Sequence, residues 1–154
     1  MSYTIVDLFD KFITIEQAGY KMFMDITTMK GVHEKVKTMA KIFAIEEKKH
    51  IEVYQNLKIK MEKEPEIEVD FFIYDKASTL IFQYSKINRT VETESPKKLL
   101  EACLGFEKDN LALLLNIRGI FIKSKADTNS PNYKAISEII TEEQKHIKSI
   151  EAFI

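Results

Sequence analysis

The chain has 154 residues, 45% of them hydrophobic and 31% charged, which is enough apolar material for a globular protein with its own core. Lys and Arg (23) nearly balance Asp and Glu (24), so no strong field would attract nucleic acid or an anionic membrane. The single cysteine excludes an internal disulfide framework and a four-cysteine zinc or iron site within this sequence. We therefore expect one domain over residues 1–154, without nucleic-acid or membrane partners.

Few residues that break helices occur in the sequence, with four Gly and three Pro, while Lys, Glu, Ile and Leu are abundant. This composition predicts an all-α fold. The N-terminus lacks a basic region followed by an apolar run, and no apolar stretch approaches the ~20 residues of a membrane span. We expect a cytoplasmic location.

Two helices are predicted in the first part of the chain, from Thr4 to about Met29 and from Val32 to about Lys63, with Gly31 between them. Glu16 interrupts the apolar stripe of the first helix. Residues 64–94 begin acidic, become aromatic and then polar, which predicts a long crossover with some helix, packed on the other helices.

Two further helices are predicted after the crossover, each beginning with a serine cap followed by proline. Ser95-Pro96 begins a helix to about Lys123, and Ser130-Pro131 begins one that runs nearly to the C-terminus, after a loop at residues 127–129. Glu107 interrupts the apolar stripe of the third helix, as Glu16 does in the first.

A Glu-x-x-His pattern occurs twice, as Glu47 with His50 and as Glu143 with His146. On a helix this spacing places a carboxylate and an imidazole on one face, one turn apart. Both pairs lie where the helix is otherwise apolar; the residues that frame them are Val36, Ala40, Phe43, Tyr54, Leu57 and Met61 in the second helix, and Ile136, Ile139, Ile150 and Phe153 in the last. Buried carboxylates need a partner, so the pattern favours a shared metal.

The inward residues form two matching halves, in which one helix supplies a Glu and the next a Glu-x-x-His pair. With a long crossover between the second and third helices, this predicts a four-helix bundle of ferritin-like connectivity, a class whose di-iron members use this ligand set. Four carboxylates balance the charge of two divalent ions and, with two imidazoles, suit iron or manganese; zinc is expected only as a substitute. The predicted ligands are Glu16, Glu47, His50, Glu107, Glu143 and His146.

Other polar or reactive residues receive simpler interpretations. His33, beside the predicted turn, is interpreted as a solvated residue, and Cys103 as a small apolar residue of the core face. Tyr20 and Tyr54 each follow a predicted ligand by one helical turn. Two interpretations are open for them: their hydroxyls donate hydrogen bonds to the ligands, or their rings simply pack in the core.

At these residues the sequence resembles the rubrerythrin-like branch of the ferritin superfamily. The resemblance extends over nearly the whole chain and rests on Glu16-x-x-Gly19-Tyr20, Glu46-Glu47-x-x-His50, Phe106-Glu107-Lys108-Asp109 and Glu142-Glu143-x-x-His146. It implies a homodimer and a non-haem di-iron centre bridged by Glu47 and Glu143, which reacts with hydrogen peroxide or dioxygen.

Two departures from that family carry expectations of their own. No rubredoxin domain is present in this sequence, so electrons would come from an external donor, such as a rubredoxin-type protein or a reductase. Asn110 replaces an additional Glu of the family, which favours a more symmetric site. The leading hypothesis is an oxidoreductase that reduces peroxide or dioxygen; the alternatives are a ferroxidase or iron-storage protein and a dimanganese catalase.

Overall fold

The computed structural model describes residues 3–63, 68–87, 91–122 and 128–152, and most of these residues are helical. The helices are α1 (Ile5–Ile26), α2 (Glu34–Glu62), α3 (Phe71–Lys86), α4 (Pro96–Ile120) and α5 (Pro131–Glu151). Two short strands, β1 (Tyr3–Thr4) and β2 (Glu68–Val69), pair antiparallel beside the start of α1. The prediction of an all-α protein is confirmed.

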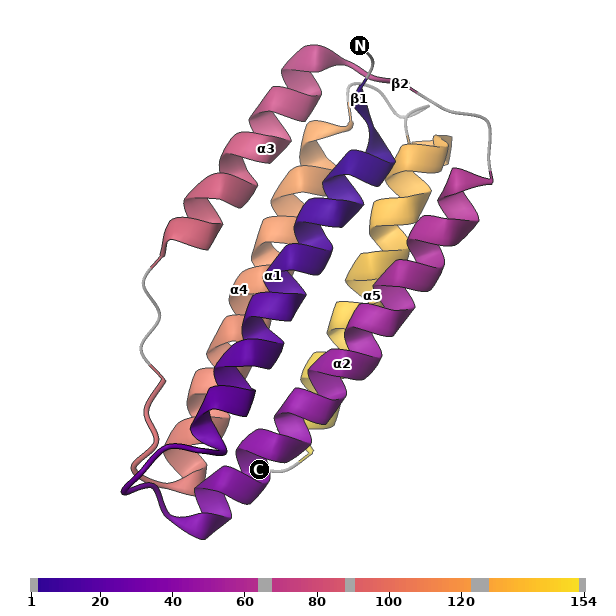
Figure 1. Cartoon of the computed structure of the whole chain (residues 1–154). Coiled ribbons are helices and arrows are strands. Elements are labelled where there is room, and N and C mark those ends of the chain that lie inside the picture. The colour runs from indigo at the N-terminus through magenta and orange to yellow at the C-terminus, as the bar shows by residue number, and fades with distance from the viewer. Residues whose placement is uncertain (1–2, 64–67, 88–90, 123–127, 153–154) are drawn as a thin grey trace.

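Four long helices, α1, α2, α4 and α5, lie side by side, and α3 lies along the outside against α1 and α4 (Figure 1). The tightest pairs are α1 with α2 and α4 with α5, and each pair is antiparallel. Because α3 runs back along the molecule, α2 and α4 run in the same direction (Figure 1). The Glu-bearing helices α1 and α4 are thereby brought together with α2 and α5.

The helix boundaries follow the capping signals in the sequence. The hydroxyl of Ser95 accepts a hydrogen bond from the Lys98 amide (3.1 Å), and that of Ser130 accepts one from the Tyr133 amide (3.2 Å), as the two serine caps predicted. In the first part of the chain the helices are shorter than predicted. α1 ends at Ile26 and α2 begins at Glu34, while Gly31 takes a φ of +80° in the turn between them.

The apolar core consists of two clusters, one on each side of the helix positions that carry the inward Glu and His residues. In α1, for example, Phe12 and Ile13 belong to the first cluster and Phe23 to the second, and Glu16 lies between them in sequence. The apolar stripes of the four long helices thus align in space. Their polar interruptions fall at one level of the fold.

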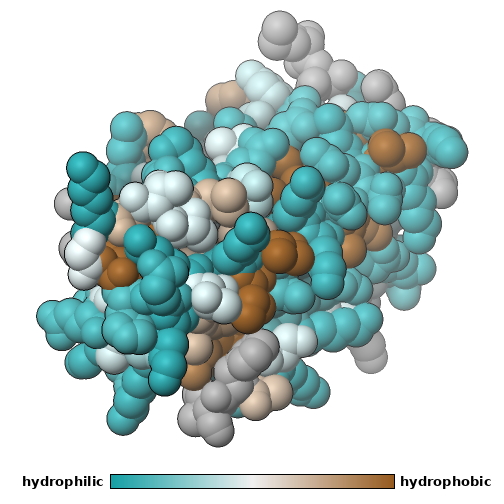
Figure 2. All heavy atoms as spheres, turned by 60° about the horizontal axis from the view of Figure 1, so that its bottom comes forward, coloured by the Kyte–Doolittle hydropathy of each residue, from teal (hydrophilic) through white to brown (hydrophobic). Residues whose placement is uncertain are grey.

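The surface is mostly hydrophilic on the face shown in Figure 2, with small hydrophobic patches among charged side chains. Helix α3 buries only Ala77 and Ile81 fully, while Phe72 is 78% exposed and Phe82 61% exposed. The predicted packing of the crossover aromatics is therefore confirmed only in part. Within the described residues, no helix has the length and the apolar character that crossing a membrane requires.

Candidate metal centre

The structure brings all six predicted ligand residues together in the interior. Each is buried, with His146 the most exposed at 8%, and they come from four different helices. Glu16 and Glu47 meet within the α1–α2 hairpin, which agrees with their similar separations in sequence from Gly31 in the turn. We call these residues the six-residue cluster: Glu16, Glu47, His50, Glu107, Glu143 and His146.

Three overlapping groups within the cluster could each hold a metal ion, with potential ligand atoms within 4.8 Å of one another. Glu47 belongs to a group with Glu16 and His50 and also to a group with Glu107 and His146. Glu143 belongs to the third group, with both histidines. We call Glu47 and Glu143 the central carboxylates, because Glu47 belongs to two of the groups and Glu143 shares its group with both histidines, whereas Glu16 and Glu107 each share a group with one histidine.

The imidazole contacts cross between the two halves of the chain. Nδ1 of His50 lies 3.2 Å from a carboxylate oxygen of Glu16 and 3.7 Å from one of Glu143. Nδ1 of His146 lies 3.3 Å from an oxygen of Glu107 and 4.0 Å from one of Glu47. Each Glu-x-x-His helix thus places its imidazole beside the inward Glu of its hairpin partner and beside the Glu of the other pair.

Electrostatics divides the four carboxylates into two kinds. Burial raises the pKa of Glu47 and of Glu143 well above the usual value, and the charges of Glu16 and Glu107 raise them further. Burial also acts to raise the pKa of Glu16 and Glu107, but hydrogen bonds outweigh it, chiefly from His50 to Glu16 and from Glu47 and His146 to Glu107, and lower both. Without a cation, the two central carboxyl groups hold protons and the two outer ones are charged.

Two neighbouring groups respond to this concentration of negative charge. Burial acts to lower the pKa of His146, but the hydrogen bond and the charge of Glu107 raise it above the usual value. Burial and the charge of Glu143 raise the pKa of Tyr54, whose hydroxyl donates a hydrogen bond to Glu143 (3.4 Å). The hydrogen-bonding interpretation of Tyr54 is therefore confirmed, and its ring also packs edge-on against His50 at 4.5 Å.

Asn110 is a member of the site whose contacts the sequence did not predict. Its amide Nδ2 donates hydrogen bonds to Oε1 of Glu16 and to Oε1 of Glu143, each at 2.6 Å, and the residue is 6% exposed. The sequence did indicate that Asn110 faces inward, because it lies on the apolar stripe of α4, one turn after Glu107. The side-chain directions of α1 and α5, which the sequence does not give, decide which carboxylates it meets.

Nε2 of His50 and Oε2 of Glu143 are buried without a hydrogen-bond partner within the described residues, and Nδ1 of His146 and Oε2 of Glu107 face each other at 3.3 Å. An unsatisfied buried polar group costs about 1–3 kcal/mol, and more when it is charged. A cation coordinated by the carboxylates and Nδ1 atoms would remove most of this cost and the mutual repulsion of the carboxylates. The donor set of four carboxylates and two imidazoles therefore fits a metal centre.

The cluster is approached from two sides. A shallow opening of about 170 Å³ lies over the two imidazoles and is lined with charged residues, among them Lys49 and Lys145. These lysines pair with Glu46 (3.5 Å) and Glu142 (3.3 Å), in the same arrangement on α2 and α5. We call it the polar opening. A second pocket, of about 240 Å³, borders the carboxylates and is mostly apolar.

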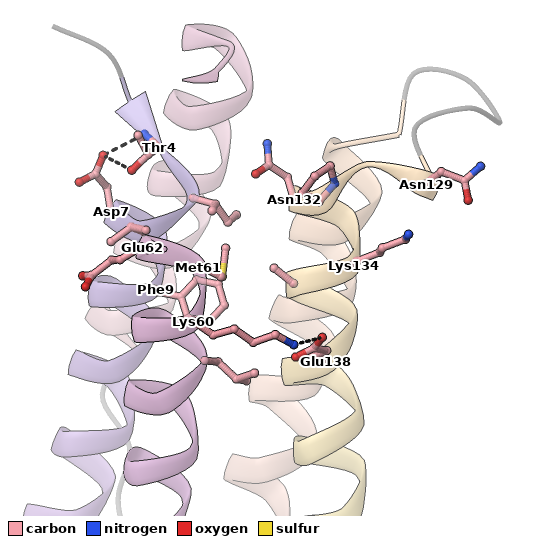
Figure 3. Close-up of a pocket in the computed structure, with 15 residues that line it drawn as sticks. Thr4, Asp7, Phe9, Lys60, Met61, Glu62, Asn129, Asn132, Lys134 and Glu138 are labelled. Carbon is pink, nitrogen blue, oxygen red and sulfur yellow. Dashed lines mark hydrogen bonds and ion pairs between the residues drawn. The ribbon is translucent and has the colours of Figure 1, made fainter. Parts of the chain in front are cut away.

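A larger cavity, about 660 Å³, lies away from the cluster, between the start of α1, the end of α2 and the start of α5 (Figure 3). Lys60 forms an ion pair with Glu138 at 3.6 Å on one side of it, and Asp7 accepts a hydrogen bond from the Thr4 amide at 2.9 Å (Figure 3). No member of the six-residue cluster lines this cavity. Although this cavity is larger, it has none of the predicted ligands in its lining and is not the candidate metal site.

The remaining candidates from the sequence have structural explanations. His33 is exposed, as expected, and also caps α2, since its Nδ1 accepts a hydrogen bond from the Lys35 amide at 3.1 Å. Cys103 is fully buried, and burial raises the pKa of its thiol, so it remains a neutral core residue. Tyr20 is half-buried against the second apolar cluster.

Comparison of the chain with protein-family models, with curated proteins and with solved structures found no match. The geometry and chemistry of the buried cluster therefore carry the functional argument.

Proposed function

We propose that this chain is a ferritin-like, rubrerythrin-type di-iron oxidoreductase that reduces hydrogen peroxide, or dioxygen, with electrons from an external donor. The fold we propose is a four-helix bundle of α1, α2, α4 and α5 with a crossover through α3. Its support is the pairing of α1 with α2 and of α4 with α5, together with the common direction of α2 and α4 (Figure 1).

One observation carries the proposal: the three possible metal-holding groups overlap, since two of them share Glu47 and the third joins Glu143 to both histidines. A single-ion site needs one group, whereas two ions need shared ligands between them. We assign Glu47 and Glu143 as bridging ligands, Glu16 and His50 to one ion, and Glu107 and His146 to the other. The four carboxylates would neutralise two divalent ions, which is why so much acidic surface can be buried here.

The bound irons would supply the two electrons of the overall reaction, H₂O₂ + 2 e⁻ + 2 H⁺ → 2 H₂O. The chain itself holds the ligands and supplies the proton environment. Tyr54 holds a proton at Oε1 of Glu143, and Asn110 fixes the orientation of the same carboxylate and of Glu16. The polar opening gives peroxide and water a hydrophilic approach over the imidazoles.

Peroxide consumption by the reduced protein tests this function. Protein loaded with iron(II) under anaerobic conditions is mixed with hydrogen peroxide, and peroxide loss and iron oxidation are followed together. We expect one peroxide consumed for every two irons oxidised, and renewed consumption after an external reductant is added. Iron that is oxidised and then accumulates as mineral in a large particle would instead indicate storage, and disproportionation of peroxide by the manganese form alone would indicate a catalase.

A further inference from the structure

A mostly apolar pocket opens beside the carboxylates of the six-residue cluster, on a different set of residues from the polar opening. Its walls come from α1, from the end of α3, from α4 and from Glu47 of α2, and Glu16, Glu107 and Asn110 also contribute to its lining. The apolar part of the lining consists mainly of Ile15, Met22, Phe23, Tyr84, Ile87 and Phe106. We call it the apolar pocket.

The apolar pocket is larger than either oxidant requires. Its volume is about 240 Å³, whereas a water molecule takes about 30 Å³ of liquid, and peroxide or dioxygen has only one oxygen atom more than water. An apolar cavity of about 150 Å³ is large enough to bind benzene in a protein core. Scaled from benzene, the pocket would hold a molecule of about ten non-hydrogen atoms (6 × 240/150). Its size and lining therefore match an organic molecule.

Gly19 keeps this pocket connected to the cluster. It lies within α1, where glycine costs about 0.5–1 kcal/mol relative to alanine, yet no positive φ requires it. A Cβ at this position would lie 3.7 Å from Oε2 of Glu47, an ordinary contact, so an alanine would fit. A longer side chain would project toward Glu47 and occupy the pocket. The glycine thus leaves open space beside a central carboxylate at a cost in helix stability.

We propose that the apolar pocket binds a small organic molecule that is mostly apolar and carries one polar end. The apolar part contacts Ile15, Met22 and Phe106, and the polar end lies beside Glu107 and Asn110. The polar opening and the apolar pocket then serve different ligands, a hydrophilic oxidant on the imidazole side and an organic molecule on the carboxylate side. The inference rests on the proposed function only in that the polar end of the ligand would lie beside bound metal. The pocket itself is formed by protein side chains and needs no metal.

Binding of 4-fluorobenzyl alcohol to the full-length chain tests the proposal, with ¹³C-methyl methionine as the reporter. Met22 lines the apolar pocket, whereas Met61 lines the large cavity at the end of the molecule, so the two methyl signals separate the sites. We expect a saturable shift of the Met22 signal, with Met61 unchanged, in protein as purified and in protein treated with a chelator. No saturable shift at Met22, or a shift only at Met61, would overturn the proposal.

Gly19→Leu should fill the pocket and weaken this binding by about tenfold or more. Gly105→Leu is the matched control, since Gly105 is an exposed glycine within α4, lies outside the pocket, and a Cβ added there would meet no atom within 4 Å. Ala18→Phe, at an exposed lining position of α1, provides a second obstruction if Gly19→Leu does not fold. Unchanged affinity in both pocket variants would contradict the proposal. Because binding is measured without iron, its failure and a failure of iron binding are separate results.

Discussion

Replacing Asn110 by leucine should destabilise the metal-free protein far more than it destabilises the iron-loaded one. The amide donates two hydrogen bonds of 2.6 Å in the buried site, one to Glu16 and one to Glu143. Glu16 is charged, since its pKa is lowered, so that bond is worth about 1.5–3 kcal/mol. Glu143 holds a proton, since burial raises its pKa, and a neutral bond adds about 0.5–1.5 kcal/mol. The expected loss is therefore about 2–4.5 kcal/mol.

Urea unfolding at neutral pH, with a chelator present, measures this loss. For a slope of about 2 kcal/mol/M, the midpoint should fall by about 1–2 M. Asn116→Leu is the matched control, because Asn116 is exposed on the same helix, and its effect should stay within about 0.5 kcal/mol. Iron should reduce the loss for Asn110→Leu to less than half, since the metals then satisfy the two carboxylates. A change below about 1 kcal/mol in the metal-free protein would refute the assigned hydrogen bonds.

Three further predictions concern charge and reactivity. The pKa values of Glu47 and Glu143 are raised above the ordinary 4.5 in the folded metal-free protein, and that of His146 is raised above 6.5. The folded state therefore holds more protons than the unfolded one, so its free energy of unfolding should fall as pH rises above about 4.5, with His146 adding to the fall above about 6.5. Urea midpoints across pH test this, and a Glu143→Gln variant with the same slope as the parent would count against it. Glu47→Ala should abolish binding of the metal pair yet leave the metal-free protein no less stable, because it removes a buried acidic group. Elemental analysis measures the bound metal and urea unfolding measures the stability, and a variant that retains two irons would disprove the bridging role. Since the Asn110 amide is a poor iron ligand, the iron(II) protein should react with peroxide and dioxygen at similar rates in stopped-flow mixing, whereas the Asn110→Glu variant should favour peroxide. If the parent strongly prefers peroxide and the variant shows the same preference, Asn110 does not set the selectivity.

The sequence predicted the long helices well because each of them has an apolar stripe along one face and a residue that marks one of its ends, such as a capping serine or a glycine in the turn. Ser95-Pro96 and Ser130-Pro131 mark two helix starts directly, and the structure places α4 and α5 there. The end of α1 was less predictable, because Met29 follows Ile26 at helical spacing although the chain already turns there. The pairing of β1 with β2 was not predicted, since strands of two residues leave no periodicity to recognise.

The cluster itself was predictable because acidic residues on apolar stripes are costly and therefore informative. Glu16 and Glu107 could be paired with the Glu-x-x-His helices that follow them because the two halves of the sequence repeat the same order. The contacts of Asn110, the crossed contacts of the imidazoles and the apolar pocket depend on how helices distant in sequence rotate against each other. Periodicity gives the inward face of a helix but not the neighbour that each side chain meets.

Iron(II) binding under anaerobic conditions tests the central claim most directly. The metal-free chain is dialysed against iron(II), and bound iron is counted by elemental analysis in the parent, in Glu47→Ala and in Glu46→Ala. Glu46 is the matched control, because it neighbours Glu47 in α2 but pairs with Lys49 at the surface. The account predicts two irons per chain in the parent and in Glu46→Ala, and loss of the pair in Glu47→Ala. No bound iron in the parent, or the same iron content in all three proteins, would contradict it.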